Sequence, residues 1–167
     1  MFRKAVVVSL RYLTRIALLA AVCVVLRYAF AGLPNIKPIT ALYFLLVDFE
    51  DLKGSLLVMA ISIFVSSFLF GMGPWVLFQI LSFAVIICLW YLLYRRLGLF
   101  GQSMLALLLA FSYGLVIDGI TALLYQMPWW TYVVAGAGFN LAHACSTMLF
   151  YPILYFILRR LYHEKNL

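Results

Sequence analysis

Six apolar stretches, separated by short polar or proline- and glycine-containing breaks, follow one another along the chain. Because glycine and proline interrupt helices, each stretch between two breaks is predicted to form one helix. The expected helices cover about residues 10–31, Ile39–Phe49, Ser55–Phe70, Val76–Tyr94, Gln102–Tyr125 and Thr131–Leu158. The second of them is short for a full membrane crossing, which takes about 20 residues.

The first break, Leu33–Ala41, holds two of the five prolines. Each proline fixes φ, removes a backbone donor and disfavours helix in the residue before it. The break is therefore predicted to be a stiff, extended hairpin, with Asn35 and Lys37 as polar tips between two rigid corners. Two interpretations stay open: a helix-breaking connection whose Lys37 touches lipid headgroups, or one wall of a binding site.

The composition indicates a membrane protein. Hydrophobic residues make up 68% of the 167 residues and charged residues 10%, and the mean hydropathy is +1.13. Soluble domains average about 45–50% apolar and about 25% charged residues. We therefore expect an all-α integral membrane protein in which residues 1–167 form one domain of six transmembrane helices. No segment has the length and polarity of a separate soluble domain, so ATP hydrolysis would require another chain.

The formal net charge of +7 is unevenly distributed. Ten of the 12 basic residues fall on one predicted side: Arg3, Lys4, Arg11, Arg15, Lys53, Arg95, Arg96, Arg159, Arg160 and Lys165. Only Arg27 and Lys37 fall on the other side. The positive-inside rule then predicts that both termini are cytoplasmic. Because topology accounts for the charge and no basic–aromatic patch is present, nucleic acid is not an expected partner.

The N-terminal stretch superficially resembles a cleavable signal peptide. It is too long for one, contains Arg11, Arg15 and Arg27, and precedes five more apolar stretches, so we reject that interpretation. The cysteines all lie inside apolar stretches, with no Cys-x-x-Cys pair and no Cys/His cluster at metal-binding spacing. No disulfide, metal site or cofactor is expected.

Five polar residues are predicted to lie within the outer half of the membrane: Arg27, Gln79, Asp118, Asn140 and His143. Asn140 and His143 are three residues apart and share a helix face. Polar side chains at this depth are costly and usually face a cavity or a partner. An outward-opening pocket is the better explanation for their shared depth. The alternatives are an Asp118–Arg27 ion pair that ties two helices together, and a His143 that donates to a helix carbonyl.

The same pattern disfavours other functions. The inner half offers only serines and no buried acid, so a conducting pore or an ion-coupled carrier is not expected. One intramembrane Asp and one His form no recognisable nucleophile–base set, and a rhomboid-like Gly-x-Ser-x-Gly motif is absent. Three outer connections contain proline, and two of them contain tryptophan; Trp129 and Trp130 are expected either as interfacial anchors or as the rim of the pocket.

Three motifs together resemble the substrate-binding (S) component of energy-coupling factor transporters. They are Leu-Pro-Asn-Ile-Lys-Pro-Ile-Thr-Ala after the first helix, Leu69-Phe70-Gly71-Met72-Gly73-Pro74-Trp75 with Gln79 after the third, and Phe139-Asn140-Leu141-Ala142-His143-Ala144 in the sixth. The size, the helix count and the expected position of the termini agree with that family. The chain departs from it after Gly-Pro, where Trp75-Val76-Leu77 replaces the usual Trp-Thr-Pro.

The resemblance implies a vitamin-binding subunit of a bacterial importer that works with a membrane scaffold subunit and two ATPase subunits. It is not expected to be an enzyme itself. It would bind its ligand under the first, third and fifth loops, and the expected substrate-binding residues are Arg27, Asn35, Lys37, Pro38, Trp75, Gln79, Asp118, Trp129, Asn140 and His143. The family docks to its scaffold through small residues on the first helix, here Ala17 and Ala21, although alanine is also ordinary in membrane helices.

The substrate class stays open. The Pro-Asn-Ile-Lys-Pro subgroup most resembles S components for cobalamin or its corrinoid precursors, and pantothenate, folate and other small vitamins are alternatives. Two other classes of function remain. A structural membrane subunit would need no polar cluster in the outer half, and a small polytopic enzyme would need a matched nucleophile and base.

Overall fold

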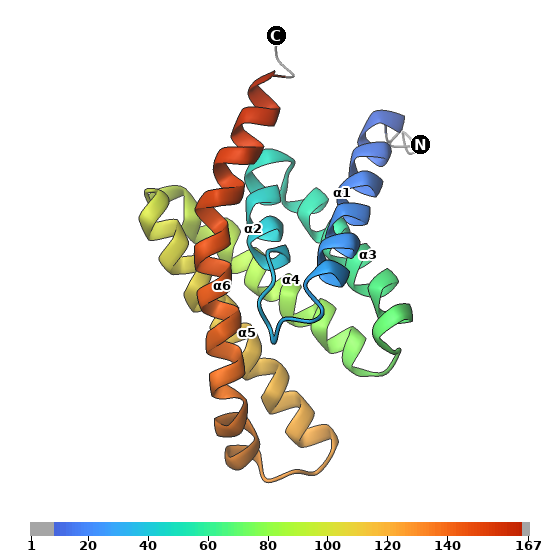
Figure 1. Ribbon diagram of the computed structural model, residues 1–167, viewed down its shortest axis with the longest axis vertical. Helices are drawn as coiled ribbons and strands as arrows, with labels where there is room; N and C mark the ends of the chain where they lie inside the picture. The colour runs from blue at the N-terminus through green and yellow to red at the C-terminus, as the bar shows by residue number, and fades with distance from the viewer. Residues whose placement is uncertain (1–8, 165–167) are drawn as a thin grey trace, which may run out of the picture.

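A computed structural model describes residues 9–164, and within this range the chain is helical, without strands (Figure 1). The helices are α1 (Leu10–Ala29), α2 (Ile39–Phe49), α3 (Leu52–Phe70), α4 (Trp75–Leu93), a 3₁₀ turn η1 (Tyr94–Arg96), α5 (Leu99–Leu124) and α6 (Trp129–Glu164). The six predicted helices are therefore present. Their predicted ends differ from these by a few residues, most of all at α6.

Five of the helices are long and apolar enough to span a membrane, and α2 is not. At 1.5 Å per residue, the 11 residues of α2 cover about 16 Å, roughly half of a 30 Å hydrocarbon core. The expectation of six full crossings thus becomes five helices of spanning length and one short helix. In Figure 1, α1 begins and α6 ends at the same end of the bundle, while the α1–α2, α3–α4 and α5–α6 connections lie toward the other end.

The short helix α2 forms the core of the bundle. Nine consecutive residues, Ile39–Val47, are buried, which is the pattern of a helix covered on all sides. The ring of Phe44 stacks on that of Trp90 in α4, with centroids 4.6 Å apart. Because the N-terminus of α2 lies partway through the bundle, the space beyond it is occupied by the preceding loop and by a cavity.

The loop that precedes α2 is not the extended hairpin predicted from its prolines. It folds in turns, and Asn35 adopts φ 58°, in the left-handed region that asparagine tolerates better than most residues. Its amide donates to the carbonyl oxygen of Phe139 at 2.9 Å, and the backbone N–H of Lys37 donates to Ser146 Oγ at 3.4 Å. Asn35 and Lys37 are half-buried against α6 and are not the tips of an extended hairpin.

At the opposite end of the bundle, polar contacts join the ends of several helices. Asp51 caps α3 by accepting from the N–H of Gly54, which moves the start of α3 three residues ahead of its predicted position. Glu50 pairs with Arg15 of α1 at 3.5 Å and accepts a hydrogen bond from Tyr162 of α6. These contacts join the helices at the end of the bundle that carries most of the basic residues.

Helix α6 is the longest element and continues through Pro152 to Glu164. A proline inside a membrane helix removes one backbone hydrogen bond but is tolerated where neighbouring groups compensate. The predicted end at Leu158 was therefore too early.

Candidate functional site

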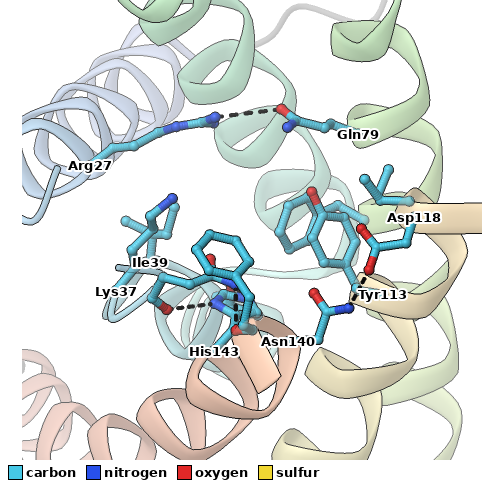
Figure 2. Close-up of a pocket in the computed structure, with 14 residues that line it drawn as sticks. Arg27, Lys37, Ile39, Gln79, Tyr113, Asp118, Asn140 and His143 are labelled. Carbon is cyan, nitrogen blue, oxygen red and sulfur yellow. Dashed lines mark hydrogen bonds between the residues drawn. The ribbon is translucent and has the colours of Figure 1, made fainter. Parts of the chain in front are cut away.

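A cavity of about 160 Å³ lies beyond the N-terminus of α2, bordered by α1, α4, α5, α6 and the α1–α2 loop (Figure 2). Seven of the ten expected substrate-binding residues line it: Arg27, Asn35, Lys37, Gln79, Asp118, Asn140 and His143. They come from segments more than 100 residues apart in the chain, and the fold brings them around one space.

Helices α5 and α6 hold the acidic side of the cavity. Asn140 donates its amide to Asp118 Oδ2 at 2.6 Å. A Cβ added at Gly136 of α6 would overlap the Asp118 carboxylate, and a Cβ added at Gly114 of α5 would overlap the Asn140 amide. Each helix thus contributes a glycine opposite the polar side chain of the other, which allows the backbones to approach closely around a partly buried polar pair.

His143 joins the loop to the start of α2. It is 4% exposed, and its Nε2 lies 3.1 Å from Thr40 Oγ1 while its Nδ1 lies 3.4 Å from the carbonyl oxygen of Asn35. A neutral ring with its proton on Nδ1 satisfies both contacts, because Thr40 then donates to Nε2. The alternative that His143 donates to a backbone carbonyl thus describes one of its two contacts, with a loop carbonyl as the acceptor.

Arg27 lies on the other side of the cavity from the α5–α6 pair. Its Nη2 donates to Gln79 Oε1 at 3.4 Å, and its guanidinium lies 5.8 Å from the centroid of the Phe70 ring. Within the described part of the chain, Arg27 and Asp118 form no ion pair. The alternative of a structural Asp118–Arg27 ion pair is therefore wrong.

Lys37 faces the cavity from the loop. Burial lowers the pKa of its ammonium, and the nearby charge of Arg27 lowers it further. Across residues 9–164 the ammonium has no hydrogen-bond or ion-pair partner, and neither has the hydroxyl of Tyr113, which also lines the cavity. Two polar groups are therefore open to whatever occupies this space.

Three of the expected binding residues do not line this cavity. Pro38 is buried at the N-cap of α2, where its ring starts the helix. Trp129 packs within the α5–α6 hairpin, its Nε1 3.2 Å from the position of a Cβ on Gly119 and its ring against Trp130. Trp75 lines a second, neighbouring cavity of about 280 Å³ between α4 and α5, which shares Gln79 and Ile117 with the first.

The sequence-based prediction missed several lining residues, among them Thr40, Phe83, Tyr113, Gly114, Ile117 and Phe139. Helical periodicity could have found some of them. Gly114 lies one turn before Asp118, and Phe139 lies one turn before His143. Phe83 likewise lies one turn after Gln79. Tyr113 carried no such signal: its ring stacks on that of Phe83, with the centroids 3.9 Å apart, a contact between two helices.

A separate apolar groove runs between α1 and α3 on the outside of the bundle. It is lined by Leu13, Ile16, Ala17, Ala20, Ala21, Val24, Val25, Ile61 and Val65. Ala17 and Ala21 are exposed on the surface of the described bundle.

Among the described residues, no three His, Cys, Asp or Glu side chains lie close enough together to hold a metal ion. No family model, no curated protein and no solved structure matches the chain.

Proposed function

We propose that the chain is a membrane-embedded binding subunit for a small water-soluble molecule, of the kind represented by the S components of energy-coupling factor importers. The observation that carries the proposal is the cavity itself, where seven of the predicted binding residues, from the loop and four helices, surround one space. Polar groups in a membrane helix bundle are costly, and clustering around a cavity indicates a binding site rather than scattered structural bonds.

The outer surface supports the same proposal. Ala17 and Ala21 lie one turn apart on an exposed apolar groove, where a partner helix could approach closely. A scaffold subunit and two ATPases would supply the energy for transport.

The size of the cavity favours a smaller ligand than the sequence resemblance suggests. Pockets that bind drug-sized ligands measure about 300–1,000 Å³, and a corrinoid is larger than most drugs. The cavity of about 160 Å³, with its neighbour of about 280 Å³, suits a vitamin of the size of pantothenate better. A corrinoid would require the α1–α2 loop to release its contacts with α6.

An enzyme remains the second candidate because of one contact. Thr40 and His143 form a hydroxyl–imidazole pair at 3.1 Å, which is the distance expected for a nucleophile and its base. Thr40 is 0% exposed, however, so its oxygen is not presented to a substrate. The pair is better explained as a bond that fixes the start of α2.

Mass spectrometry of small molecules that co-purify with the detergent-solubilised chain tests the proposal. We expect one polar molecule with a mass in the range of a small vitamin, released when the protein is denatured. Recovery of lipid and detergent alone, together with no melting shift on addition of a panel of vitamins, would contradict a binding function.

A further inference from the structure

Two cationic side chains of the cavity have no counter-ion among the described residues. Arg27 donates a hydrogen bond only to the neutral amide of Gln79, and the Lys37 ammonium has no partner within residues 9–164. Asp118 lines the same cavity but is bonded to Asn140 and pairs with neither cation in the described chain. Two like charges around a partly buried space repel one another, and an anion between them would relieve that repulsion.

The positive and negative groups lie on different sides of the cavity. Figure 2 shows Lys37 and Asp118 on opposite sides, with Arg27 reaching in from α1. The N-terminus of α2 also borders the cavity through Ile39 and Thr40, and no side chain in the described part of the protein caps it. A helix N-terminus carries partial positive charge and free N–H groups, so it adds to the field of the two cations.

We propose that the cavity binds a small organic acid, with its anionic group seated against Lys37 and Arg27 and its remaining polar atoms toward Asp118 and Tyr113. This inference rests on the proposed binding function and names its substrate class. It separates the candidate vitamins, because pantothenate and nicotinate carry a carboxylate, whereas thiamine is a cation and riboflavin is neutral.

The test compares acids with neutral analogues of nearly the same shape. The protein in detergent is titrated calorimetrically with pantothenate and pantothenol, and with nicotinate and nicotinamide. The difference within each pair measures the contribution of the carboxylate charge to the affinity. We expect at least one acid to bind, and its neutral partner to bind roughly tenfold or more weakly, the loss expected for one charge-assisted hydrogen bond.

Substitution of Lys37 tests whether its ammonium causes the preference for the acid over the neutral analogue. Lys37→Gln should abolish the preference for the acid, whereas Lys37→Arg should keep it. Both variants retain the backbone N–H that bonds Ser146, so the loop keeps that contact. Lys53→Gln is the matched control, because this exposed lysine lies at the start of α3, away from the cavity.

The outcomes separate the two proposals. Equal binding of acid and neutral analogue, or binding of thiamine or riboflavin instead, overturns the inference while leaving the binding function in place. If no panel member binds, the co-purified molecule decides: an acid supports the inference, and a molecule without an acidic group overturns it. If nothing binds and nothing co-purifies, the binding function fails and the inference fails with it.

Discussion

Two glycines determine how the polar pair at the α5–α6 interface fits. Gly114 lies against Asn140 and Gly136 against Asp118, so a methyl group at either glycine would displace a side chain that lines the cavity. Gly138 lies two residues away on α6 and has no neighbouring atom within 4 Å of an added Cβ. The three positions therefore form a matched set.

We predict that Gly136→Ala and Gly114→Ala each destabilise the ligand-free protein by about 1–3 kcal/mol, the usual cost of overpacking. Gly138→Ala should be neutral, or stabilising by up to about 1 kcal/mol, because alanine is the better helix former. Thermal melting in detergent measures all three. Equal melting temperatures for Gly136→Ala and Gly138→Ala would show that Asp118 moves aside without cost.

At the scale of helices, α1 has one face that packs and one that does not. Ile16, Ala20 and Cys23 are its buried residues, whereas Ala17 and Ala21 face the outer groove. The exposed face has the small residues that close helix association needs.

If the chain is the importer subunit proposed above, Ala17→Trp or Ala21→Trp should leave ligand binding by the isolated chain intact and lower uptake by the assembled importer, since a bulky side chain blocks close approach. Leu18→Trp is the control, because Leu18 is 62% exposed but does not line the groove. Binding and uptake are measured on the same preparations. Unchanged uptake in both alanine variants would mean that partners dock elsewhere.

The helices were the most predictable part of the structure. Apolar stretches between proline and glycine breaks located all six, because composition and breakers act locally. The path of the α1–α2 loop was not predictable in this way: its prolines indicated an extended hairpin, but contacts of Asn35 and Lys37 with α6 decide its shape. The depth of Asp118, Asn140 and His143 indicated a pocket, whereas the bonds that Asp118 and His143 make depend on helix packing that no local pattern encodes.

At the scale of the molecule, the contacts of Arg15 and Tyr162 with Glu50 link α1 and α6 at one end of the bundle, and the cavity lies toward the other end. The basic asymmetry of the sequence predicts that the first end is cytoplasmic.

Cysteine labelling tests this topology. After replacement of Cys23, Cys88 and Cys145 by alanine, a cysteine at Lys53 or Gly98 should react only with reagents that enter the cytoplasm. A cysteine at Gln126, which lies in the α5–α6 connection, should react with impermeant reagents added outside. The reverse pattern would place the cavity on the cytoplasmic side.

The central claim is that the cavity beyond α2 holds a small polar ligand, and filling the cavity tests it most directly. Ile117 lines both this cavity and its neighbour, so Ile117→Trp should occupy the space. Leu108→Trp adds the same side chain to an exposed position of the same helix. The measurement is the molar ratio of co-purified small molecule to protein. We predict about one per chain in the unsubstituted protein and in Leu108→Trp, and about a tenth of that or less in Ile117→Trp, as a roughly 80-fold rise in Kd, or about 2.6 kcal/mol, requires. An undiminished ratio in a folded Ile117→Trp protein would contradict the account.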